Sequence, residues 1–145
     1  MIKRSLLIIF LLIGINQVFA QSKEALAGKW LTATGDAQVQ IYPAGGKFSG
    51  RIVWLKKPDD NTGKPQTDNK NPDPGLAKRP IIGLEMLKGF TYVDDGIWEG
   101  GTIYDPKTGK TFSCKISMVD HNKIFVRGFV GISLLGRTET WSRVR

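Results

Sequence analysis

Five acidic side chains could perform acid–base chemistry, and most of them stand in predicted turns. They are Asp73, Glu99, Asp105 and the adjacent pair Asp94–Asp95. Two carboxylates can act as general acid and general base when a fold brings them to one substrate. Asp95-Gly96 and Asp105-Pro106, however, have the composition of tight turns. An enzyme that uses Asp73 or Glu99 is therefore the weakest hypothesis, and we predict a protein that is not an enzyme.

Histidine, cysteine and metal chemistry have little support in this chain. His121 is the only histidine and stands in a predicted turn, and Cys114 is the only cysteine. A histidine-based triad is therefore not expected, and an intrachain disulfide is impossible. Residues 59–63 (DDNTG) resemble a calcium loop, but the glycine comes one position early and no glutamate stands at the twelfth position. We predict no metal and no cofactor.

Aromatic side chains at strand spacing could instead line a cavity for an apolar ligand. The candidates are Trp30, Trp54, Trp98, Tyr104, Phe112 and Phe125. Arg127, between Phe125 and Phe129 in the alternation, is the candidate cation for a carboxylate head group. Two alternatives stay open: the aromatic residues form an ordinary core, and Arg127 faces solvent while Ile124 and Val126 face inward.

The elements that would position these residues are short strands. Alternating apolar and polar residues, separated by turn residues, predict strands near residues 28–33, 37–42, 48–55, 90–93, 97–104, 111–119, 124–130 and 137–144. Residues 80–87 fit either a short helical turn or the start of a strand. Glycines inside strands, at Gly100–Gly101 and Gly128, suggest the bends that closure requires. We predict an all-β fold, a small antiparallel up-and-down barrel of about eight strands, rather than a sandwich.

One long polar segment, residues 56–80, interrupts the strand pattern. It contains several prolines and only Leu76 as a large apolar residue. A connection of this length is commonly either functional or mobile. Its candidate partner-binding residues are Asp68, Asn71, Asp73 and Arg79. Turn formation around Asn71-Pro72-Asp73 is the simpler interpretation.

The first twenty residues have the three parts of a secretory signal peptide. Lys3 and Arg4 precede an apolar run, and Val18-Phe19-Ala20 precedes the expected cleavage point. The run is shorter than a membrane-spanning helix needs. We predict residues 1–20 as a signal peptide, residues 21–145 as one domain, and a periplasmic or secreted location without a membrane span.

Removal of Lys3 and Arg4 lowers the formal net charge from +8 to +6. Positive charge favours anionic partners. Lysines and arginines are scattered, however, so the excess charge favours solubility. Nucleic-acid binding is not predicted, because it would need a basic stripe interleaved with exposed aromatic residues. The oligomeric state stays open.

Five sequence blocks resemble those of the exported bacterial family called domain of unknown function 2147. They are VQIYP from Val39, GRIVWL from Gly50, DNKNPD from Asp68, WEGGTIYDPKTGKTF from Trp98, and RGFVG from Arg127 with GRTETWSR from Gly136. The resemblance implies a lipocalin-like barrel with no assigned reaction. It also implies that Trp30, in Gly28-x-Trp30, closes one end beneath a basic residue, either Arg137 or Arg143.

This chain departs from the family at its cysteines. Many members of the family carry paired cysteines at positions corresponding to Ala44 and Ser49, and near Phe129 and Gly136. None of these positions is a cysteine here. Any role that depends on those disulfides therefore does not carry over.

Two functional hypotheses follow from these features. The first is an exported lipocalin-like protein that binds a small apolar or amphipathic ligand non-covalently inside the barrel. The alternative is an envelope interaction module that binds a protein or a glycan through the loop 56–80.

Overall fold

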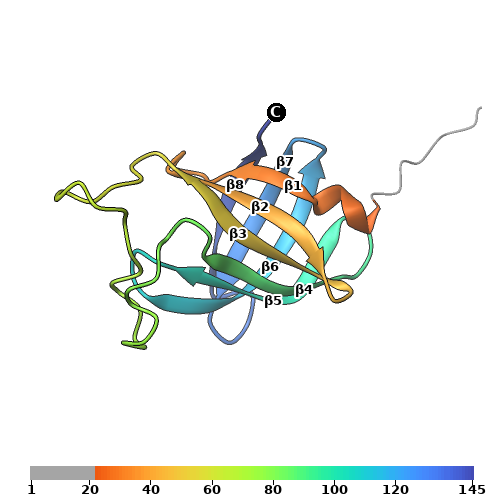
Figure 1. The fold of residues 1–145 in the computed structure, drawn as a ribbon. Coiled ribbons are helices and arrows are strands. Elements are labelled where there is room, and N and C mark those ends of the chain that lie inside the picture. The colour runs from red at the N-terminus through yellow and green to blue at the C-terminus, as the bar shows by residue number, and fades with distance from the viewer. Residues whose placement is uncertain (1–21) are drawn as a thin grey trace, which may run out of the picture.

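The computed structural model describes residues 22–145, which form one closed antiparallel barrel (Figure 1). A 3-10 helix, η1 (Lys23–Leu26), precedes eight strands. They are β1 (Gly28–Leu31), β2 (Ala37–Ala44), β3 (Lys47–Leu55), β4 (Glu85–Tyr92), β5 (Ile97–Asp105), β6 (Lys110–Asp120), β7 (Lys123–Phe129) and β8 (Gly136–Arg143). Each strand pairs with the next, and β1 pairs with β8. The predicted up-and-down barrel is confirmed. The predicted signal peptide lies outside the described residues.

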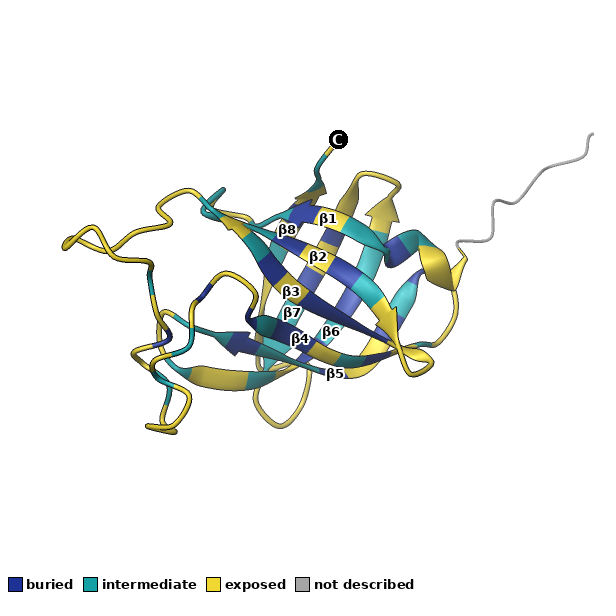
Figure 2. Ribbon diagram, viewed as in Figure 1, coloured by how far each residue is buried: buried dark blue, intermediate teal, exposed yellow. Residues whose placement is uncertain are grey.

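Period-two alternation places one face of each strand inside the barrel. In β6 and β7 the inward side chains are those of Cys114, Ile116, Ile124 and Val126, and all four are buried (Figure 2). Burying each large aliphatic side chain stabilises the fold by about 1.5–3 kcal/mol. Cys114 faces the interior as predicted, and burial raises the pKa of its thiol to about 12. The cysteine is therefore a core residue.

Glycine makes the bend in β5. The pairing of β5 with β6 shifts register between Trp98 and Gly101, and Gly100 has a φ of 76°. That conformation favours glycine. A Cβ on Gly101 would lie 2.6 Å from ring atoms of Phe90. Both glycines are therefore required where the strand curves against β4.

The segment whose structure the sequence left open, residues 80–87, is a short turn that leads into a strand. Ile81 and Leu84 form a short turn in which the Leu84 amide donates to the Ile81 carbonyl over 3.0 Å. The strand β4 then begins at Glu85, several residues before the predicted strand. Leu84, Met86 and Leu87 are buried, so this apolar run forms part of the barrel wall.

The barrel is closed at the end where β1 begins. Trp30 is fully buried there, and its indole N–H donates to the Leu26 carbonyl over 2.9 Å. The guanidinium carbon of Arg143 lies 4.3 Å from the centre of the Trp30 ring. Arg143 also donates to the carbonyls of Ala25, Ala27 and His121. Of the two basic residues considered, Arg143 covers the tryptophan.

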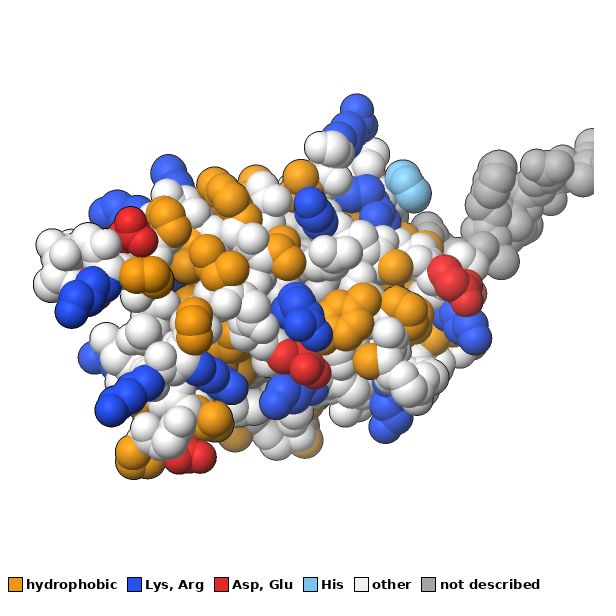
Figure 3. All heavy atoms as spheres, in the orientation of Figure 1, with side chains coloured by type: hydrophobic (Ala, Val, Ile, Leu, Met, Phe, Trp, Pro, Cys, Tyr) orange, Lys and Arg blue, Asp and Glu red, His pale blue; other side chains and the backbone are white. Residues whose placement is uncertain are grey.

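The other end of the barrel carries the long loop and three shorter connections. In an up-and-down barrel, alternate connections lie at the same end. The β1–β2, β3–β4, β5–β6 and β7–β8 connections therefore surround one opening. Lys and Arg side chains are spread over the face shown in Figure 3 rather than gathered in one patch. No helix in residues 22–145 is both long and apolar enough to cross a membrane.

Candidate functional site

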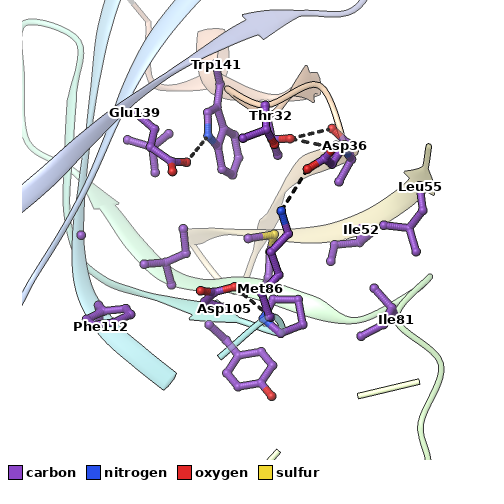
Figure 4. Close-up of a pocket in the computed structure, with 18 of the residues that line it drawn as sticks. Thr32, Asp36, Ile52, Leu55, Ile81, Met86, Asp105, Phe112, Glu139 and Trp141 are labelled. Atoms are coloured by element: carbon purple, nitrogen blue, oxygen red, sulfur yellow. Dashed lines mark hydrogen bonds and ion pairs between the residues drawn. The ribbon is translucent and has the colours of Figure 1, made fainter. Parts of the chain in front are cut away.

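A cavity of about 540 Å³ occupies the open end of the barrel (Figure 4). Side chains from β2 to β8 and from the β1–β2 and β5–β6 connections line it. Those on its walls include Ile52, Leu55, Ile81, Met86, Ile103, Tyr104, Phe112, Val126 and Trp141. Ligand sites in proteins commonly measure about 300–1,000 Å³ and have apolar walls with a few polar groups. This cavity therefore has the size and the lining of a small-molecule site.

Two charged side chains enter the cavity from the inner face of β8. Arg137 and Glu139 line it and stand opposite Gly128 and Val126 of β7. The Trp141 indole N–H donates to a Glu139 carboxylate oxygen over 3.4 Å, as Figure 4 shows. Neither Arg137 nor Glu139 forms an ion pair with another residue in the described range 22–145. Within the described residues, the cavity lining thus contains one cation, the exposed Arg137, and one carboxylate, Glu139, that form no ion pair, and Glu139 is hydrogen-bonded to Trp141.

An ion pair lies at the rim of the opening. Asp36, in the β1–β2 connection, and Lys107, in the β5–β6 turn, meet with 2.9 Å between Oδ2 and Nζ. The two connections lie half-way around the eight-stranded barrel from each other. The Lys107 hydrogen bond holds the pKa of Asp36 below its usual value. Both side chains are well exposed, so the pair contributes little to stability.

The sequence-predicted cavity residues divide into two groups by their depth in the barrel. Tyr104 and Phe112 line the cavity, whereas Trp30 and Trp98 are fully buried and lie outside its lining. Trp98 packs against Tyr92 with ring centres 5.2 Å apart. Its indole nitrogen finds no acceptor within residues 22–145. Trp30 and Trp98 are therefore core residues rather than cavity residues.

The prediction that Trp54 lines the interior is wrong. A register shift in the pairing of β2 and β3 leaves Val53 without a partner, so Trp54 stands opposite Gln38. Trp54 is 40% exposed, and Leu55 lines the cavity instead. A bulge of this kind exchanges inward and outward positions along a strand. It cannot be read from alternation alone.

Phe125 also lies on the outside, contrary to the prediction that it lines the interior, and Arg127 lies on the same outer face. Phe125 is 41% exposed, because Ile124 and Val126 take the inward positions of β7. Arg127 donates to the Ser133 carbonyl over 2.7 Å and to the Thr138 hydroxyl over 2.9 Å. The solvent-facing alternative for Arg127 is therefore correct, and the cation in the cavity is Arg137.

Three of the four candidate loop residues converge on the barrel rather than on solvent. Asp68 is fully buried and accepts a hydrogen bond from the Tyr104 hydroxyl over 2.5 Å. Its other oxygen accepts from Asn71 Nδ2 and Arg79 Nε, each over 2.9 Å, and lies 2.9 Å from Arg79 Nη2. Buried carboxylates require such partners. Asp68, Asn71, Arg79 and Tyr104 thus form one cluster, the Asp68 anchor, which fixes the long loop to β5.

Asp73 lies apart from the anchor. It is exposed, and its Oδ1 accepts from the Gly75 amide over 2.8 Å. The Asp73 amide in turn donates to Asn71 Oδ1 over 2.8 Å. These bonds are the local turn bonds that Asp and Asn commonly form. The carboxylate of Asp105 likewise accepts from Lys107 N and Thr108 Oγ1 within its own turn, as the composition predicted.

The anchor predicts a late-titrating tyrosine. Burial, and then the hydrogen bond to Asp68, raises the pKa of Tyr104 to about 12. The stability that comes from the neutral phenol is complete below the unfolded value of about 10 and is lost as pH rises through the folded pKa. In an ultraviolet titration, one of the three tyrosines should ionise only near pH 12. In Tyr104→Phe that late step should disappear, and its persistence would contradict the assignment.

The closed eight-stranded barrel with one open end defines a lipocalin-like protein. A solved structure that is similar in fold is titled "Protein HP1028 from the human pathogen Helicobacter pylori belongs to the lipocalin family". It aligns with a TM-score of 0.73 at 22% sequence identity and covers 83% of each chain. At this identity the likeness concerns the fold.

The chain belongs to the family described as "Uncharacterized protein conserved in bacteria (DUF2147)", whose sequence model matches residues 28–143. The predicted family is confirmed, and the match spans all eight strands. No curated protein matches the sequence. The description of the family names no reaction.

Proposed function

We propose that this protein binds one small apolar or amphipathic molecule non-covalently in the cavity at the open end of the barrel. The observation that carries the proposal is the cavity of about 540 Å³ with aliphatic and aromatic walls. An eight-stranded barrel has room for either a side-chain core or one small ligand. Here the core residues Trp30 and Trp98 fill the closed half, which leaves the open half for the ligand.

The polar groups of the cavity favour an amphipathic ligand over a pure hydrocarbon. Arg137 and Glu139 line the site without an ion-pair partner among the described residues. Arg137 is exposed and Glu139 is partly buried, so a ligand that carries a polar or charged group beside an apolar body would form charge-assisted hydrogen bonds with them. The apolar body would then contact Ile52, Met86 and Phe112.

The alternative, partner binding through the loop 56–80, has weaker support. Its candidates Asp68, Asn71 and Arg79 already satisfy one another within the Asp68 anchor. Asp73 is exposed and remains available, but its carboxylate forms a turn bond. A partner would therefore have to recognise the remaining exposed residues of the loop.

We also propose export, on the pattern of residues 1–20 alone. N-terminal sequencing of the protein from an envelope or culture fraction should then begin at Gln21. An N-terminus at Met1 in the cytosolic fraction would contradict this localisation.

The cavity is tested by filling it from Gly128. This glycine lines the cavity, and a Cβ placed on it would lie 3.5 Å from Ile103 Cγ2 and 3.6 Å from Phe112 Cβ, which are ordinary contacts. Gly128→Phe should therefore occupy the binding volume without disrupting the strand. The phenylalanine ring would exclude the apolar probe N-phenyl-1-naphthylamine from this volume. We expect its affinity to fall about tenfold or more, which corresponds to a loss of at least about 1.4 kcal/mol of binding free energy.

The matched control is Gly128→Ala, which adds only the Cβ and should retain probe binding close to that of the wild type. Both variants should keep the circular dichroism spectrum and cooperative unfolding of the wild type. If Gly128→Phe is folded and binds the probe as tightly as Gly128→Ala, the ligand does not occupy this cavity.

A further inference from the structure

The hairpin loop between β7 and β8, residues 130–135, exposes an unusual number of aliphatic side chains. Val130 is 67% exposed, Ile132 58%, Leu134 83% and Leu135 71%. The loop projects from the barrel as a separate exposed segment (Figures 1 and 2). Single exposed aliphatic residues are ordinary, but a contiguous group of them commonly marks an interaction site. We name residues 130–135 the aliphatic loop.

The aliphatic loop is held in a defined conformation. The Leu135 amide donates to the Ile132 carbonyl over 3.0 Å. Arg127, which lies outside the loop, donates to the Ser133 carbonyl within it and to the Thr138 hydroxyl on β8. These hydrogen bonds satisfy the Ile132 and Ser133 carbonyls and fix the backbone of the turn. The aliphatic side chains are exposed on this fixed turn rather than packed against the barrel.

The surroundings of the loop are positively charged. Residues 121–138 contain no aspartate or glutamate, and they include Arg127 and Arg137, whereas Glu139 follows directly and lines the cavity. Lys115 stands opposite Arg127 on β6 and lines the groove beside Leu134, although Glu99 lies 3.6 Å from its Nζ. Cations beside exposed aliphatic residues are the combination that binds interfaces of anionic lipid.

The position of the loop relative to the cavity adds a second argument. The β7–β8 connection lies at the same end of the barrel as the β1–β2 and β5–β6 connections, which line the cavity mouth. A surface that contacts the loop tip would therefore lie close to the opening. A lipid surface there would let an apolar molecule move between cavity and bilayer with little exposure to water.

We propose that the aliphatic loop inserts into the interface of a lipid bilayer with anionic head groups and turns the open end of the barrel toward that surface. A protein partner is the less suitable occupant. The loop exposes four aliphatic side chains and contains no tryptophan, tyrosine or arginine, whereas the energetic centres of protein interfaces are enriched in those three residues. Leu134 and Leu135 enter the acyl boundary, and Arg127 beside the loop faces the head groups.

The test is flotation of the full protein with vesicles. Vesicles of phosphatidylglycerol and phosphatidylethanolamine should capture the wild type, with weaker capture at high salt and by phosphatidylcholine alone. The double variant Leu134→Ser, Leu135→Ser should weaken vesicle binding about tenfold or more. It loses the favourable free energy of moving two leucine side chains from water into the bilayer. The matched control, Val93→Ser with Val119→Ser, removes exposed valines near the closed end and should bind as the wild type does.

Several results would overturn the proposal. They are no capture of the wild type by either kind of vesicle, equal loss in the loop and control variants, or undiminished binding of the loop variant. Concentration-dependent self-association that the loop variant abolishes, without vesicle capture, would assign the aliphatic loop to a second copy of the chain. Gly128→Phe should still float with the vesicles, so a failure of ligand binding is distinguishable from a failure of membrane binding.

Discussion

Trp30→Ala is expected to lower the free energy of unfolding by about 4 kcal/mol, since truncation of a buried tryptophan commonly costs about 3–5 kcal/mol. Trp30 is fully buried at the closed end. Its indole ring lies under the Arg143 guanidinium, and its N–H donates to Leu26. The substitution removes the ring, leaves a cavity beneath Arg143 and removes the donor for the Leu26 carbonyl.

Guanidinium chloride unfolding, followed by circular dichroism, measures this loss. The matched control is Trp54→Ala, which truncates the same side chain on the outer wall, where it is 40% exposed. The control should cost clearly less than the substitution at Trp30. Comparable losses would show that burial at the closed end does not determine the stability of the barrel.

Asp68→Ala is expected to lower the free energy of unfolding by about 3 kcal/mol. Breaking a buried ion pair on one side commonly costs about 3–5 kcal/mol, and each buried polar group left without a partner costs about 1–3 kcal/mol. Alanine would remove the acceptor for Tyr104, Asn71 and Arg79 together. Arg79 is partly exposed and can turn to solvent, so the lower part of the range applies.

Because Asp68 fixes the long loop, a second effect should accompany the lost stability. Limited proteolysis of Asp68→Ala should cut within residues 56–80 faster than in the wild type. Asp73→Ala, in the same loop but exposed, is the control and should leave unfolding nearly unchanged. If both variants are cut at equal rates, the loop is not held by the Asp68 anchor.

Local sequence patterns were sufficient to predict the fold. Strands follow from period-two alternation, and the turn at Asp105–Gly109 follows from residues whose side chains bond to their own backbone. The glycine pair Gly100–Gly101 predicted the bend in β5. These features depend on interactions between neighbours in the chain, so a single sequence contains them.

The candidate site depends on features that alternation does not reveal. The bulge at Val53 turns Trp54 outward, and no residue in this part of the sequence is characteristic of a bulge. Phe125 is aromatic but occupies an outward position, because Ile124 and Val126 fix the parity of β7. The contact between Asp68 and Tyr104 joins residues 36 positions apart, which only the closed barrel brings together.

A signal for the cavity charges was nevertheless present in the sequence. Trp141 is an apolar residue in the last strand, and counting back from it in steps of two reaches Glu139 and Arg137. Both face the cavity. The alternation in β8 could therefore have been fixed from Trp141, which would have identified Arg137 and Glu139 as cavity residues and Arg137, rather than Arg127, as the candidate cation.

The central claim is that the open half of the barrel holds a ligand, and native mass spectrometry tests it most directly. Protein from its natural compartment, sprayed without denaturation, is predicted to show a discrete adduct of one small molecule per chain. Denaturation should release the adduct, and Gly128→Phe prepared in the same way should lack it. A wild-type protein that appears only at its own mass, and that also fails to bind N-phenyl-1-naphthylamine, would contradict the claim.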